Sequence, residues 1–137
     1  MAGLANSDLR RLSLTYGVDS DETQTYALQI DDEDEPTIFE VIGQHPNFKR
    51  NVLQANAEKS SSFLGKEYVG VIGKSDIQRI KNVASTINVD NETVEWDCQD
   101  YVLGTLDKLE EEFVLDEDDQ DYRDARSILK RKRGAII

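Results

Sequence analysis

The sequence predicts an α+β fold in which an antiparallel sheet from the N-terminal half packs against helices from the C-terminal half. In residues 11–16 and 25–30 apolar side chains alternate with polar ones, which is the period of a half-buried strand. From Ile77 onward they recur at steps of three and four residues, the period of an amphipathic helix. Strands and helices in separate blocks of the chain are typical of α+β proteins. We therefore expect one α+β domain at residues 10–134, a flexible N-terminus at 1–9 and a tail at 135–137.

Strands are expected throughout the first half. The first places Leu12, Leu14 and Tyr16 on one face and ends at Gly17. The second carries an equivalent alternation at residues 25–30, and an acidic turn at 31–35 joins it to a β-branched strand at 37–42, so the two form a hairpin. A turn at 44–49, a short strand at 51–55, a polar loop at 58–62 and a strand at 68–72 follow.

Three helices are expected in the second half. Ser75 is placed to cap the first, whose apolar stripe comprises Ile77, Ile80, Val83, Ala84 and Ile87. Asp97 is placed to cap the second, whose inward face comprises Cys98, Val102, Leu106 and Leu109. After an acidic connection, residues 122–133 form a third helix, mostly on the surface, with Ala125, Ile128 and Leu129 inward.

The charge of the chain limits its partners. Its 137 residues include 16 Lys and Arg against 28 Asp and Glu, a net charge of −12, which repels nucleic acid and anionic lipid. A basic protein partner remains compatible with this charge. No apolar run approaches the roughly 20 residues of a membrane span, and no signal pattern is visible, so we expect a soluble cytoplasmic protein.

No cofactor is expected. One Cys and one His cannot form a usual zinc site, and the glycines match no nucleotide-binding signature. The acidic runs at 31–35 and 116–121 lack the spacing of a calcium loop, so solvated charge is the favoured interpretation. The basic residues 130–133 resemble a nuclear-localisation patch, but cations also complement the C-terminal end of a helix.

Cys98 is the main candidate for chemistry, and it has two interpretations. A thiol at a helix N-terminus meets unpaired backbone N–H groups that favour the thiolate, which would make it a nucleophile. A free Cys is also among the most buried residue types, and here it begins the apolar stripe of the second helix. A nucleophile needs a base, and His45 is the only imidazole in the sequence.

The motif around Cys98 resembles that of a known group. Residues 96–102 read Trp-Asp-Cys-Gln-Asp-Tyr-Val and, with residues 37–43 and 89–95, are similar to small fungal proteins that carry a Trp-Asn-Cys-Gln-type motif. That group has a circularly permuted papain-like fold, the class of lecithin:retinol acyltransferase and NlpC/P60-like proteins. The resemblance implies a Cys that opens a helix packed on the sheet, preceded in the chain by a His on a strand.

Two positions depart from the pattern of that group. The resemblance implies a catalytic His about where Thr25 stands, and Thr cannot act as a base near neutral pH. Asp97 replaces the usual Asn, and a carboxylate beside a thiol disfavours its thiolate. Both changes weaken a papain-like mechanism.

Three functions follow as hypotheses. The first is a catalytically atypical papain-like domain that binds an apolar small molecule in a pocket lined by Tyr26, Phe39, Trp96 and Tyr101, as a cyclase, isomerase or accessory protein of a fungal biosynthetic pathway. The alternative is a thiol hydrolase or acyltransferase with Cys98 as nucleophile and His45 as base. A third is a non-catalytic protein whose acidic surface meets a basic partner.

Overall fold

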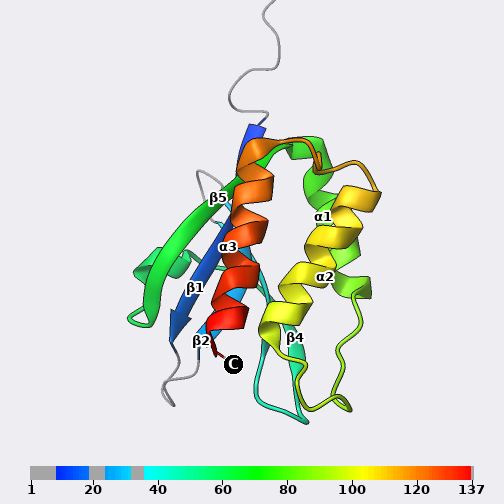
Figure 1. Ribbon diagram of the computed structural model, residues 1–137. Coiled ribbons are helices and arrows are strands. Elements are labelled where there is room, and N and C mark those ends of the chain that lie inside the picture. The colour runs from blue at the N-terminus through cyan, green and yellow to red at the C-terminus, as the bar shows by residue number, and fades with distance from the viewer. Residues whose placement is uncertain (1–8, 19–23, 32–35, 137) are drawn as a thin grey trace, which may run out of the picture.

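In the part of the chain that the structure describes, five strands form one antiparallel sheet, and three helices lie over one face of it (Figure 1). The computed structural model describes residues 9–18, 24–31 and 36–136, with side chains up to residue 130. The segment expected to be flexible before Leu9, most of the acidic turn at 31–35, the side chains of the basic residues 131–133 and Ile137 lie outside the described residues. The predicted α+β class with an antiparallel sheet is confirmed.

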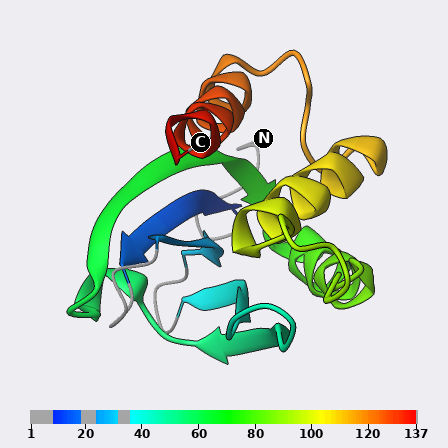
Figure 2. The ribbon, with the colours of Figure 1, turned by 60° about the horizontal axis from the view of Figure 1, so that its bottom comes forward.

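The bounds of the elements are close to those predicted. The strands are β1 (Leu9–Val18), β2 (Gln24–Ile30), β3 (Thr37–Ile42), β4 (Lys49–Gln54) and β5 (Phe63–Gly73). The helices are α1 (Ile77–Thr86), α2 (Cys98–Glu111) and α3 (Gln120–Ile136). β5 is longer than expected, because it pairs with β1 through two register shifts and bends strongly along its length (Figure 2).

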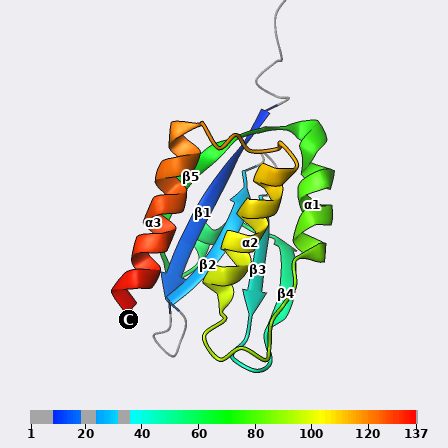
Figure 3. The same ribbon diagram turned by 45° about the vertical axis from the view of Figure 1, so that its right-hand side comes forward.

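The sheet has the order β4-β3-β2-β1-β5. The first four strands follow one another as a meander, and β5 returns to pair with β1 at the opposite edge from β4. α2 contacts β2 and β3, α3 contacts β5, and α1 packs beside α2 (Figure 3). The first turn of α2 therefore lies at the end of the sheet where β2 begins and β3 ends.

One hydrophobic core joins the helices to the sheet. Leu12, Leu14 and Leu28 are fully buried on the sheet side, and Val102 and Leu109 meet them from α2. The alternation in β1 and β2 and the apolar stripe of α2 thus face each other, as predicted. α3 buries Tyr122, Ala125 and Leu129 on this core and leaves most of its other described residues exposed, as predicted, while Ile128, predicted to face inward, is half-buried.

The helix starts differ in how they are capped. Asp97 caps α2 as predicted, because its carboxylate accepts a hydrogen bond from the Gln99 N–H (3.0 Å) while Asp100 accepts one from the Asp97 N–H (2.9 Å). Ser75 does not cap α1, so that prediction is wrong. A 3-10 turn over Lys74–Asp76 includes Ser75, and α1 begins only at Ile77.

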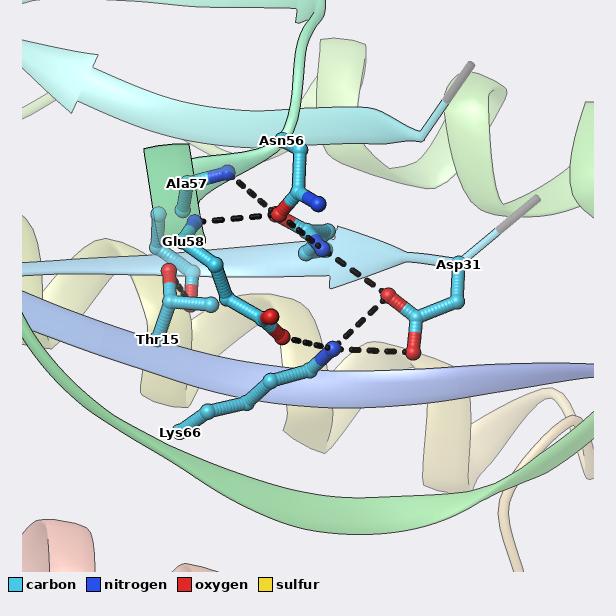
Figure 4. A network of polar contacts seen from close by, with 8 residues as sticks. Thr15, Asp31, Asn56, Ala57, Glu58 and Lys66 are labelled. Carbon is cyan, nitrogen blue, oxygen red and sulfur yellow. Dashed lines mark hydrogen bonds and ion pairs between the residues drawn. The ribbon is translucent and has the colours of Figure 1, made fainter. Parts of the chain in front are cut away.

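A network of polar contacts lies on the face of the sheet away from the helices (Figure 4). Buried Gln29 accepts a hydrogen bond from the Ala57 N–H (2.9 Å) and donates to Asp31 (2.8 Å). Lys66 pairs with Asp31 and with Glu58, in each case at 2.9 Å. These bonds hold the 3-10 helix Ala57–Lys59 across the strands, where the sequence suggested only a polar loop.

Candidate functional site

A cavity of about 620 Å³ lies at the end of the sheet where α2 begins. It is formed where the start of β2, the end of β3, the following turn and the segment before α2 converge. Its lining comprises Gln24, Thr25, Glu40, Val41, Ile42, Gly43, Gln44, His45, Phe48, Ser62, Val94, Glu95, Trp96, Asp97 and Cys98. The cavity therefore brings together three of the residues singled out in the sequence, namely Cys98, His45 and Trp96.

The aromatic wall of this cavity is held by hydrogen bonds to the backbone. Asn91 accepts from the Phe48 N–H (2.7 Å) and donates to the Phe48 carbonyl (3.2 Å), which ties the β3–β4 turn to the segment before α2. The ring of Phe48 then meets Trp96 edge to face, with centroids 5.5 Å apart. Two aromatic rings from distant parts of the sequence thus form one surface.

The mouth of the cavity exposes apolar side chains. Val94 is 74% exposed and Ile42 is 45% exposed, while Trp96 and Phe48 are half-buried. Large apolar side chains gathered around a concave surface are typical of sites that bind apolar ligands. The cavity walls therefore favour a molecule with an apolar body.

Cys98 lines the cavity as a buried thiol whose raised pKa keeps it neutral at neutral pH. The thiol donates to the Gln24 carbonyl oxygen, with 3.8 Å between sulfur and oxygen. Burial raises its pKa from 9.0 to about 11; backbone hydrogen bonds lower this pKa only partly, and the charge of Asp97 raises it further. This direction is opposite to the one that a nucleophilic thiolate at neutral pH needs.

His45 lines the same cavity from the β3–β4 turn. Its side chain is exposed, and it precedes Pro46 in the turn. The hydrogen-bond acceptor described for the Cys98 thiol is the Gln24 carbonyl, not the imidazole. Cys98 and His45 therefore share a cavity, while the described hydrogen bond of the thiol goes to the backbone of β2.

The three other aromatic residues expected to line the pocket lie deeper. Phe39 and Tyr101 are fully buried in the core, and the Tyr101 hydroxyl donates to the Ala84 carbonyl (2.8 Å). Neither lines the 620 Å³ cavity. Tyr26 is 4% exposed and lines a second, smaller cavity, with its hydroxyl donating to Gln24 (2.8 Å). Periodicity alone could not separate core positions from cavity walls.

The second cavity, of about 230 Å³, lies on the opposite face of the sheet under the Ala57–Lys59 segment. It shares Thr25, Glu40 and Ser62 with the first, so the two cavities adjoin. Its other lining residues are Thr15, Tyr16, Gly17, Tyr26, Ala27, Ile38, Leu53, Ala55, Asn56, Ala57, Ser60 and Phe63.

The two cavities meet where the sheet divides. In the described strands, β2 pairs with β3 only through residues 27–30 and 37–40, with Ala27 opposite Glu40 as the last pair. Beyond it β2 stays paired with β1 as far as Gln24, and β3 stays paired with β4 as far as Ile42. The two strands thus separate at this end, and residues 24–26 face residues 41–42 without a ladder between them.

Sequence reasoning missed Phe48, Val94 and Glu40. Phe48 and Val94 lie in turns without periodicity, and only the tie made by Asn91 brings Phe48 to Trp96. Glu40 interrupts an apolar strand, which is a signal visible in the sequence. Glu40 lines the cavities because β2 and β3 stop pairing next to it, and that point is set by the pairing register of the two strands.

Comparisons with protein-family models, with curated proteins and with solved structures find no match to this chain. Within the part of the chain that the structure describes, no helix is long and apolar enough to cross a membrane. The described side chains also contain no group of three or more His, Cys, Asp or Glu placed to hold a metal ion. In the acidic run at 116–121, Asp116 and Asp119 instead accept hydrogen bonds from nearby backbone N–H groups.

Proposed function

We propose that this chain is a catalytically atypical, permuted papain-like domain that binds an apolar small molecule in the cavity beside Trp96. The observation that carries the proposal is the pairing of a partly open cavity, one wall of which is the Trp96–Phe48 aromatic pair, with a lining thiol whose pKa is raised by burial. Binding then depends on the walls formed by Trp96 and Phe48 and not on thiol chemistry.

The position of Cys98 supports the papain-like part of the proposal. Cys98 opens α2 and packs against β2 at Gln24, next to Thr25. Thr25 is the position where the resemblance implies a His, and it lines the same cavity. This arrangement has the cysteine, the strand and the cavity of a papain-like site but lacks the imidazole on the strand. It fits a site that binds a ligand in its pocket without Cys–His chemistry. Such a domain would act as a cyclase, isomerase or accessory protein of a biosynthetic pathway.

A thiol hydrolase or acyltransferase is the second candidate, because His45 and Cys98 line one cavity. In that reaction His45 would take the thiol proton, and the thiolate would attack an acyl carbon to form a thioester. The bond to the leaving alcohol or amine would break, and the protonated imidazole would give it the proton. The buried thiol and its raised pKa argue against this reaction at neutral pH.

Titration with Nile red, a neutral apolar dye, separates the two. We expect saturable binding that Trp96→Ala weakens by about tenfold or more and that Cys98→Ala leaves within about twofold. Phe113→Ala is the matched control, since Phe113 is 93% exposed and lies outside the cavity. Absence of saturable binding, or equal loss in the Trp96 and Phe113 variants, would overturn the proposal.

A further inference from the structure

Glu40 occupies an unusual place for a carboxylate. It lies on β3 at the last pair that joins β2 to β3, and it lines both cavities. Its side chain is half-buried in an otherwise apolar strand whose neighbours Phe39 and Val41 are in the core. Carboxylates are rarely buried without a partner that offsets the loss of hydration.

The described partner of Glu40 is neutral. Asn51 on β4 donates from Nδ2 to Glu40 Oε2 at 2.7 Å. Among the described residues no Lys, Arg or His forms an ion pair with Glu40. Burial raises the pKa of this carboxyl, and the hydrogen bond from Asn51 offsets that only partly. One carboxylate oxygen is thus held in position by Asn51, while no cation among the described side chains pairs with the charge.

The surroundings of Glu40 differ on its two sides. In the larger cavity the apolar side chains of Trp96, Phe48 and Ile42 lie among polar ones, which include Glu95 and Asp97. The smaller cavity is lined mostly by apolar side chains, with the polar groups of Thr15, Asn56 and Ser60 among them. A ligand that reaches Glu40 from the larger cavity would keep its apolar body against the rings and place its polar end at the carboxylate.

We propose that the divided end of the sheet binds a small amine with an apolar body, with its ammonium group held at Glu40. An ammonium supplies the cation that the buried carboxylate lacks, and a charge-assisted hydrogen bond in a partly dehydrated site is stronger than a neutral one. The net charge of −12 also attracts a cation toward the protein. This inference rests on the proposed function and names the class of its ligand.

The test compares three compounds that differ only in their polar end: 4-phenylbutylamine, 4-phenylbutanol and 4-phenylbutyrate. Calorimetric titration of the whole chain is expected to show the amine binding about tenfold or more tightly than the alcohol, and the acid binding most weakly. Glu40→Gln keeps the shape of the side chain and an acceptor for Asn51. It should remove most of the preference for the amine while leaving the affinity for the alcohol within about twofold.

Glu117→Gln is the matched control, because it removes the same charge from an exposed position outside both cavities. It should keep the preference for the amine. Equal affinity for amine and alcohol, or equal loss in both Gln variants, would overturn the amine inference and leave the proposed function standing. If none of the compounds binds and Nile red also fails to bind, both fall. Thermal melting of each variant verifies that it is folded.

Discussion

The Cys98 sulfur lies 3.8 Å from the Gln24 carbonyl oxygen, so the thiol at the start of α2 is hydrogen-bonded to the first residue of β2. This contact joins helix to sheet at the edge of the larger cavity. The only Cys of the chain is thus a buried, neutral hydrogen-bond donor.

Cys98 is therefore expected to react slowly. Because burial raises its pKa to about 11, iodoacetamide should label the folded protein at pH 8 far more slowly than the unfolded protein. Labelling in native buffer and in guanidinium, followed by mass spectrometry, measures the ratio. Rapid native labelling with an apparent pKa below the ordinary value of 9.0 would instead support the nucleophile.

Cys98→Ala should cost about 1 to 2 kcal/mol of unfolding free energy, since it removes a buried sulfur and its hydrogen bond. Urea unfolding measures this change. A loss below about 0.3 kcal/mol would mean that the contact with Gln24 contributes little to stability.

Glu40→Gln should stabilise the protein at pH 7. Burial raises the pKa of Glu40 in the folded state, so the folded protein holds this proton more tightly than the unfolded chain. The free energy of unfolding therefore falls as pH rises from about 4.5 through the folded-state pKa. The variant removes a half-buried charge, so its advantage should grow as pH rises above the ordinary pKa of 4.5 and vanish below it. Urea unfolding from pH 3.5 to 8 measures the difference. A difference that does not change with pH would contradict the burial of an ionised Glu40.

Gln29→Ala should destabilise the polar network on the face of the sheet away from the helices. Gln29 is 1% exposed, and its loss leaves the part-buried Ala57 N–H without its described acceptor and removes one donor from Asp31, at a cost of about 1 to 3 kcal/mol. Faster hydrogen exchange at Ala57 should accompany the loss. Gln78→Ala, at an exposed position of α1, is the control and should change stability by less than about 0.5 kcal/mol.

Phe113→Gly should stabilise the end of α2. Phe113 has a φ of 62°, and the Val114 N–H bonds back to the Leu109 carbonyl, the arrangement in which glycine usually follows a helix. Glycine adopts a left-handed backbone without strain, and this gain exceeds the cost of its greater entropy in the unfolded chain by about 0.5 to 1 kcal/mol. Little packing is lost because Phe113 is 93% exposed. Phe113→Ala keeps the Cβ atom and should give no such gain in a thermal melt. If both variants behave alike, backbone strain at this position is negligible.

The local patterns of the sequence predicted the elements well and the site in part. The alternation of Leu12 and Leu14 and the spacing of Val102 and Leu109 are consequences of burial on one face, and the core confirms both. The role of Glu40 depends on where β2 and β3 stop pairing, and the Phe48–Trp96 contact depends on Asn91. These are relations between residues far apart in the chain, and no local period contains them.

The most direct test of the account is to measure Nile red affinity in the wild type, Trp96→Ala and Cys98→Ala under one set of conditions. The account predicts a loss of about tenfold or more for Trp96→Ala and a change within about twofold for Cys98→Ala. The reverse pattern, with binding or turnover lost in a folded Cys98→Ala variant and kept in Trp96→Ala, would show that the thiol does the chemistry and would contradict the account.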